Sequence, residues 1–190
     1  MNVPIDISTV SLRTSRLTLR PFCGSDLDDF FAYASVDGVG QMAGWTPHKD
    51  KKETQTILDL FINENKTFAL VHNGKVIGSL GIEEYDEEKY PEFADKKCRE
   101  LGFVLSKAYW GQGLMPEAVK AVIGFLFEKV GLDVILCGHF ADNRQSGRVQ
   151  EKCGFRCYAA ETYKTQAGTV RNGVMNILTR RDWTAAQAQN

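Results

Sequence analysis

The chain has 190 residues, of which 43% are hydrophobic and 25% charged, and its formal net charge is -1. This length suits one domain with a sizeable core rather than two, and the charge balance excludes a whole-chain attraction to nucleic acid or to an anionic membrane. No apolar run approaches the roughly 20 residues of a membrane helix, and residues 1–10 lack the pattern of a secretory signal peptide. We therefore expect a cytoplasmic protein with a single domain over residues 1–190 and its core over about residues 10–183.

The chain opens with a predicted strand and a predicted helix. Residues 16–22 alternate apolar and polar side chains and end in a strand-breaking Pro21. Ser25 stands three residues before Asp28, as a helix N-cap would, and apolar residues follow at helical spacing until Gly38.

A second helix and a hairpin are predicted next. Asp50 and Glu53 have the spacing of a capping box, with Asp in the place of Ser or Thr. An Asn-Gly pair at 73–74 divides the apolar run 67–82, which predicts a β-hairpin. Residues 83–97 are acidic and mostly polar, so we expect an exposed connection.

The middle of the chain carries the strongest periodicity. Residues 99–106 form an apolar run typical of a strand buried on both faces, and residues 114–130 place their apolar side chains on one helical face. Residues 133–140 predict another buried strand, and residues 143–152 a helix that stops at Gly154.

The chain closes with two predicted antiparallel strands, 157–163 and 170–179, and a frayed tail from Trp183 onward. The middle pattern of strand, helix, strand and helix implies one parallel step, whereas the flanking hairpins imply antiparallel neighbours. We therefore expect a mixed α/β (α+β) domain around a central mixed sheet.

Residues 110–117, Trp-Gly-Gln-Gly-Leu-Met-Pro-Glu, lie between a buried strand and the strongest helix. Gly111 and Gly113 allow close backbone approach, and the helix N-terminus beyond them offers unpaired N–H groups and a positive dipole end. The loop therefore predicts a site for a phosphate or pyrophosphate, although a tight turn without a ligand explains the same glycines. It lacks the Gly-Lys-Ser/Thr of a Walker loop and the third glycine of the dinucleotide fingerprint.

A second motif follows the next strand. Asn143 and Ser146 begin a helix that ends in Glu-Lys-Cys-Gly-Phe at 151–155. Taken alone, Asn143 is explained as a helix cap. Together with Glu-Leu-Gly-Phe-Val-Leu at 100–105, the loop at 110–117 and Leu-Arg-Thr-Ser-Arg-Leu-Thr-Leu-Arg-Pro at 12–21, it resembles the GNAT superfamily of N-acetyltransferases, in the branch that acetylates the N-termini of ribosomal proteins.

The resemblance implies a fold, an activity and a cofactor. It implies a central, mostly antiparallel sheet of about seven strands with a parallel splayed pair, flanked by about four helices. The implied reaction transfers an acetyl group from acetyl-CoA to a primary amine, on a protein N-terminus or a small molecule, by direct attack on the thioester. An exposed strand edge would also allow a homodimer.

The resemblance also implies which residues hold the cofactor. The backbone of residues 104–106 would pair with the pantetheine arm, residues 112–115 would hold the pyrophosphate, and Asn143 would bond the arm from the other side. The implied set is Phe103, Val104, Leu105, Ser106, Trp110, Gly111, Gln112, Gly113, Leu114, Met115, Asn143 and Ser146. Met115 departs from the usual Gly or Ala of the phosphate loop, so its side chain must point away from the pyrophosphate.

Three residues are candidates for the chemistry. The Tyr that serves many relatives as general acid would fall near Gln150, so Ser146 becomes the candidate proton source for the leaving thiolate. Glu100 and His139 compete as general base, and water relay from either remains open. Without a catalytic role, Glu100 would be a surface or salt-bridged carboxylate and His139 a histidine packed within its strand.

Trp45 and Glu83 are candidates for the acceptor side; the alternatives are a core tryptophan and a solvated acidic loop. We expect no metal site, because Cys153 and Cys157 lack a second Cys/His pair, and the five cysteines read as buried free thiols. A catalytically silent acyl-CoA sensor is the alternative function; a nucleotide-binding domain fits less well.

Overall fold

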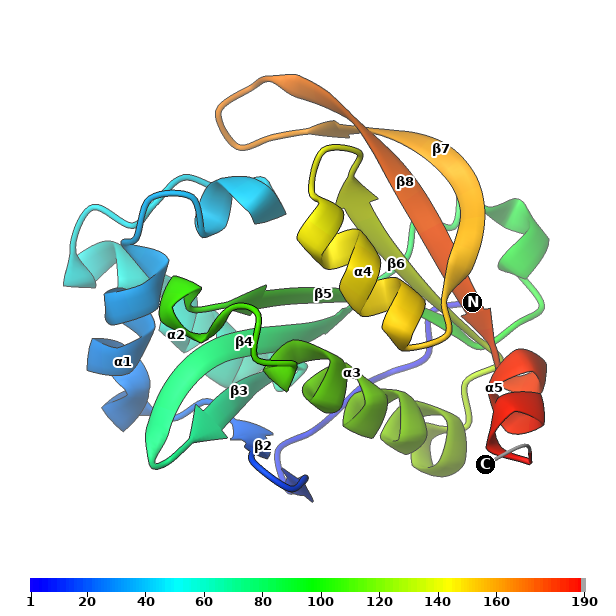
Figure 1. Ribbon diagram of the computed structural model, residues 1–190, viewed down its shortest axis with the longest axis horizontal. Helices are drawn as coiled ribbons and strands as arrows, with labels where there is room; N and C mark the ends of the chain where they lie inside the picture. Colours follow the sequence, from blue (N-terminus) through cyan, green and yellow to red (C-terminus); the bar gives the residue numbers. More distant parts are fainter. Residues whose placement is uncertain (189–190) are drawn as a thin grey trace.

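The computed structural model describes residues 1–188, and its eight-stranded sheet has the order β1-β2-β3-β4-β5-β6-β8-β7 (Figure 1). The strands are β1 (Leu12–Arg13), β2 (Thr18–Pro21), β3 (Thr67–His72), β4 (Lys75–Glu83), β5 (Cys98–Leu105), β6 (Val134–Phe140), β7 (Arg156–Lys164) and β8 (Val170–Thr179). The α-helices are α1 (Leu27–Ala34), α2 (Lys51–Glu64), α3 (Leu114–Phe125), α4 (Arg144–Lys152) and α5 (Arg180–Gln187). Shorter helical turns are η1 (Gly24–Asp26), η2 (Gly40–Ala43), η3 (Pro91–Phe93), η4 (Lys107–Tyr109) and η5 (Leu126–Val130), the last a π-helical continuation of α3.

The predicted mixed, mostly antiparallel sheet is confirmed, because β5 and β6 are its one parallel pair of named strands within the described chain. The additional strand is the two-residue β1, and the additional helix is α5. The prediction of a frayed tail from Trp183 is wrong for the described part. The Thr179 side chain accepts a hydrogen bond from Asp182 N at 3.1 Å, and the Trp183 ring lies 5.4 Å from that of Phe127.

The two predicted helix caps have different outcomes. Ser25 lies inside η1 and is not the N-cap of α1; the neighbouring Asp26 carboxylate accepts from Cys23 N at 2.9 Å instead. Asp50 is confirmed as the N-cap of α2, because its Oδ1 accepts from Glu53 N at 2.9 Å. The hairpin at 73–74 is also confirmed.

Apolar side chains cover both faces of the sheet. One cluster lies under α3 and α4, which stand in front of the sheet in Figure 1, and a second lies under α1 and α2. A third buries Tyr85, Tyr90 and Phe93. The segment 83–97 is therefore not a simple exposed connection, because its aromatic residues close the far end of the second face.

The parallel pair separates along its length. β5 and β6 are in register only at Cys98–Val134, Arg99–Ile135 and Glu100–Leu136, and beyond these pairs the strands diverge (Figure 1). Just past the last pair, Cys137 Sγ donates to the Leu101 carbonyl at 3.2 Å. The edge of β5 that faces β6 is thus left without ladder partners beyond Glu100, as a splayed pair predicts.

Among the described residues, no helix combines the length and the apolar character that crossing a membrane requires.

Candidate active site

A cavity of about 630 Å³ occupies the gap between β5 and β6 and extends to the start of α3 and along α4. The structure brings most of the predicted site residues to this cavity. Those that line it are Glu100, Phe103, Val104, Leu105, Trp110, Gly111, Gly113, Leu114, Met115, His139, Asn143 and Ser146.

The loop before α3 has the backbone shape that its glycines predict. Gly111 and Gly113 adopt φ of +75° and +74°, a region that side chains other than glycine rarely enter. Gly113 is the N-cap of α3, and no side chain caps the first N–H groups of the helix. These donors and the helix dipole make the loop suited to an anion. Met115 is only 4% exposed and packs in the core.

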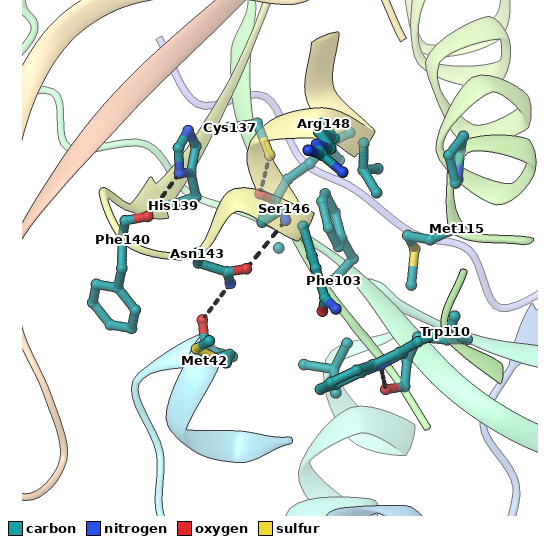
Figure 2. A pocket seen from close by; sticks show the side chains of 18 of the residues that line it. Met42, Phe103, Trp110, Met115, Cys137, His139, Phe140, Asn143, Ser146 and Arg148 are labelled. Carbon is teal, nitrogen blue, oxygen red and sulfur yellow. Dashed lines mark hydrogen bonds between the residues drawn. The ribbon is translucent and has the colours of Figure 1, made fainter. Parts of the chain in front are cut away.

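Two side-chain contacts hold this loop in place. Trp110 Nε1 donates to the Leu105 carbonyl at 2.8 Å (Figure 2), and Arg16 Nη1 donates to the Gln112 carbonyl at 2.8 Å. Arg16 also pairs with Glu117 at 2.7 Å. Burial raises the pKa of Glu117, but hydrogen bonds from Thr14 and Arg16 outweigh it and lower the pKa to about 2. The first turn of α3 is therefore fastened to the N-terminal segment.

Basic side chains on α4 face the same half of the cavity. Arg148 and Lys152 both line it, one turn apart on the helix, and Figure 2 shows Arg148. Sequence reasoning missed both, although Arg144, Arg148 and Lys152 recur at a spacing of four residues, which is a visible signal. Arg148 and Lys152 add positive charge to the cavity that the α3 N-terminus also lines, as a pyrophosphate or phosphate ligand would require.

Asn143 and Ser146 form one network at the start of α4. Asn143 Oδ1 accepts from Ser146 N at 3.1 Å, and its Nδ2 donates to the Met42 carbonyl at 3.1 Å (Figure 2). Ser146 Oγ accepts from Gln150 Nε2 at 3.2 Å. The Ser146 hydroxyl hydrogen therefore stays available to a group in the cavity.

Three hydrogen bonds, from Arg171, Gln166 and Asn143, hold the segment around η2 at the rim of the cavity, and we call them the clasp. The β7–β8 hairpin holds the segment around η2 through Arg171 Nη1, which donates to the Gln41 carbonyl at 3.0 Å, and through Gln166 N, which donates to the Gly44 carbonyl at 2.8 Å. Asn143 adds the bond to the Met42 carbonyl at 3.1 Å. In each of these three bonds the acceptor on the η2 side is a backbone carbonyl.

Glu100 is the strongly perturbed carboxyl group of the cavity. Burial, followed by repulsion from Glu83, raises its pKa to about 7, while Lys89 and a backbone hydrogen bond from Gly138 oppose the rise. Asp86 adds a further repulsion. A carboxyl with this pKa exchanges a proton near neutral pH, as a general base must.

Glu100 points to the sheet face opposite α3 and α4. Alternate residues of a strand point to opposite faces, and Leu101 and Cys137 belong to the core cluster under α3 and α4. Their neighbours Glu100 and Gly138 therefore face the other side. In agreement, a Cβ atom built at Gly138 would lie 3.3 Å from Glu100 Oε1.

His139 points to the α4 side. Its Nδ1 lies 2.8 Å from the Phe140 carbonyl (Figure 2), and a Cβ atom built at Gly147 of α4 would lie 3.2 Å from its Cε1. The two candidate bases thus line the same cavity from opposite faces of the sheet.

Four predicted site residues lie outside the cavity lining. Ser106 N is taken by the Ile77 carbonyl at 2.7 Å, and the Gln112 side chain donates to Ala108 at 3.2 Å. Trp45 packs over Gly40 and lies 5.2 Å from the His48 ring, which fits the alternative of a core residue. Glu83 pairs with Lys66 at 2.8 Å and reaches the cavity only through its charge on Glu100.

Of residues 1–188, no group of three or more His, Cys, Asp or Glu side chains is arranged to hold a metal ion. The five cysteines are free; Cys98, Cys137 and Cys153 are buried as expected, whereas Cys23 and Cys157 are exposed.

Comparison with known proteins gives one consistent family. Residues 16–156 match the model of the acetyltransferase (GNAT) domain. The chain is 29% identical over 152 residues to the uncharacterized N-acetyltransferase YoaA of Bacillus subtilis, covering 76% of this chain and 82% of that protein. It is 31% identical over 85 residues to the [ribosomal protein uS5]-alanine N-acetyltransferase of Escherichia coli, covering 44% of each. In fold it is similar to a GNAT-family acetyltransferase from Bacillus anthracis, with a TM-score of 0.77, 19% identity, and 90% and 99% of the two chains covered.

Proposed function

The chain belongs to the GNAT acetyltransferase family and is an acetyl-CoA-dependent N-acetyltransferase; we propose that it transfers the acetyl group to a primary amine, on a protein N-terminus or a small molecule, which attacks the thioester directly in the gap between β5 and β6. The observation that carries this proposal is Glu100, a buried carboxyl with a pKa raised to about 7 inside that gap.

The residues present fit coenzyme A. The α3 N-terminus, Arg148 and Lys152 offer donors and positive charge to a pyrophosphate, and the free edge of β5 at Phe103 offers backbone groups to an amide-containing arm. Bound there, acetyl-CoA would supply an activated acyl group with a thiolate as leaving group. The Trp110 indole already occupies the Leu105 carbonyl, and Val104 pairs with Ser79 of β4, so Phe103 is the better backbone partner.

Glu100 is proposed as the general base. An amine must lose a proton when it forms the amide bond, and Glu100 Oε1 can accept that proton near pH 7. His139 remains the competitor, but one of its nitrogens lies at the Phe140 carbonyl and its ring rests on α4. The position of Glu100 on the face away from α4 supports an acceptor that enters from that side.

Ser146 is proposed as the proton source for the thiolate. Its Oγ accepts from Gln150, so its own proton is free to be directed into the cavity. Proton acceptor and proton donor would then act from opposite faces of the sheet, so neither interferes with the other.

The test is release of free thiol from acetyl-CoA with a panel of amines that includes peptides with free N-termini and small polyamines. The E. coli relative named for an alanine of ribosomal protein uS5 makes N-terminal peptides the first choice. Wild-type turnover with at least one amine supports the proposal. A raised melting temperature with acetyl-CoA, combined with no turnover on any amine, would instead support the alternative of a catalytically silent acyl-CoA sensor.

A further inference from the structure

Tyr163 on β7 lines the cavity, and no hydrogen bond within the described chain explains why its side chain carries a hydroxyl group. It lines the cavity, yet its buried hydroxyl has no hydrogen-bond partner among the described residues. Buried polar groups are normally paired, because an unpaired one loses its hydration without compensation. An unpaired hydroxyl in a cavity therefore indicates a ligand group as its partner.

Two glycines make room for this side chain. Tyr163 crosses the neighbouring strand at Gly173, where a Cβ atom would overlap its ring, and reaches Gly138 of β6, where a Cβ atom would overlap its hydroxyl oxygen. The Phe140 ring supports it edge-on, with centroids 5.8 Å apart and planes at 79°. The ring thus spans from β7 across β8 to β6, at the border of the gap.

The hydroxyl ends beside Glu100. The Cβ position at Gly138 that overlaps Tyr163 Oη lies 3.3 Å from Glu100 Oε1, so both oxygens flank one point on the face away from α4. Burial, followed by the charges of Glu100 and Glu161, raises the pKa of Tyr163. The phenol therefore stays protonated at neutral pH and can both donate and accept.

We propose that Tyr163 is a catalytic residue that binds the acceptor amine and carries its proton to Glu100. The phenol oxygen accepts a hydrogen bond from the amine N–H, and the phenol O–H donates to the Glu100 carboxylate. As the C–N bond forms and the C–S bond breaks with its electron pair leaving on sulfur, the amine proton passes to the phenol and the phenol proton to Glu100. Tyr163 ends the step as it began, and Glu100 releases the proton to solvent.

The inference rests on the proposed function, and Tyr163→Phe tests it, because this change removes the hydroxyl and keeps the ring. With the amine that the wild type uses best, we expect kcat/KM for that amine to fall about 10- to 100-fold, as for loss of a hydrogen bond to a charged group. The KM for acetyl-CoA should stay unchanged. In the profile of kcat against pH, which reports the enzyme–substrate complex, the acidic limb should move to higher pH, because the carboxylate loses a donor there.

Tyr158→Phe is the matched control. Tyr158 lies on the same strand, but its hydroxyl contacts Glu92 at the surface and the residue does not line the cavity. This variant should retain wild-type kinetics.

Gly138→Ala supplies a second route, since the added methyl group would occupy the position of the Tyr163 hydroxyl. It should reproduce the kinetic loss while acetyl-CoA still raises the melting temperature. Gly124→Ala, where a methyl group meets no atom within 4 Å, is its control.

The outcomes separate the two proposals. An active wild type with unchanged kcat/KM and pH profile in Tyr163→Phe overturns the role of Tyr163 and leaves the proposed function standing. A wild type that acetylates no amine overturns both. If Gly138→Ala fails to fold, as judged by its circular dichroism, Tyr163→Phe alone decides.

Discussion

The two faces of the gap between β5 and β6 are built in different ways. On the α3–α4 face, the cofactor side, the groups suited to a ligand are a helix terminus, a glycine loop and neighbouring turns of one helix. On the opposite face, which we propose as the acceptor side, Glu100 and Tyr163 come from distant strands and both lie beside Gly138. Short contiguous motifs thus encode the first face, whereas tertiary structure assembles the second.

The largest expected effect tests the acceptor side. Glu100→Gln should lower kcat/KM at least about 100-fold and flatten the acidic limb near pH 7, because a general base contributes roughly 10²–10⁴-fold. Steady-state rates from pH 5.5 to 9 measure it. The affinity for acetyl-CoA, followed by thermal shift, should not change.

His139→Ala is the competing experiment. If it removes the acidic limb while Glu100→Gln keeps it, the base lies on the cofactor side, and the assignment of roles to the two faces is overturned.

The next effect tests the cofactor side. Ser146→Ala should lower kcat about tenfold, because the leaving thiolate loses the hydrogen bond through which Ser146 would supply its proton. Its dissociation constant for acetyl-CoA should remain close to that of the wild type, measured by calorimetry. Equal loss of turnover and affinity would make Ser146 a binding residue instead.

A smaller effect concerns charge along α4. Arg148→Gln should weaken acetyl-CoA binding a few-fold, by about 1 kcal/mol, and the difference should shrink with added salt. Calorimetry at two ionic strengths measures it. Arg144→Gln, on the same helix but outside the cavity lining, is the control and should bind as the wild type does.

A separate effect is on stability rather than on turnover or binding. The pKa of Glu100 is about 7 in the folded protein, above the ordinary value of 4.5, so the folded state holds the proton more strongly than the unfolded state. Ionising Glu100 in the folded protein therefore lowers the free energy of unfolding. This loss is absent below pH 4.5 and complete above pH 7. Glu100→Gln should therefore stabilise the protein by about 1–3 kcal/mol at pH 8 and by little at pH 4.5. Urea unfolding of the variant and the wild type at pH 8 and at pH 4.5 measures this change. A stability difference of equal size at both pH values would contradict the prediction.

The sequence predicts local elements well where one signal dominates. The hairpin at 73–74, the cap at Asp50 and the parallel step around α3 are confirmed, because turn chemistry, capping and periodicity act over a few residues. The tail after Trp183 was mispredicted, because its helix depends on docking against Phe127.

The residues of the candidate site differ in the same way in how well the sequence predicts them. The glycine loop and Asn143 could be predicted, since each belongs to a contiguous motif. Tyr163 could not, because its relevance depends on Gly138 and Gly173, two positions on other strands that only the folded sheet brings beneath its ring.

The clasp at the cavity rim has an evolutionary consequence. Arg171, Gln166 and Asn143 hold the segment around η2 by its carbonyl groups, which every amino acid supplies. Replacing the side chain of Met42 therefore alters the wall of the cavity without breaking the bond that keeps this wall in place. Such an arrangement lets the shape of the cavity change one substitution at a time while the backbone that carries its wall stays constant.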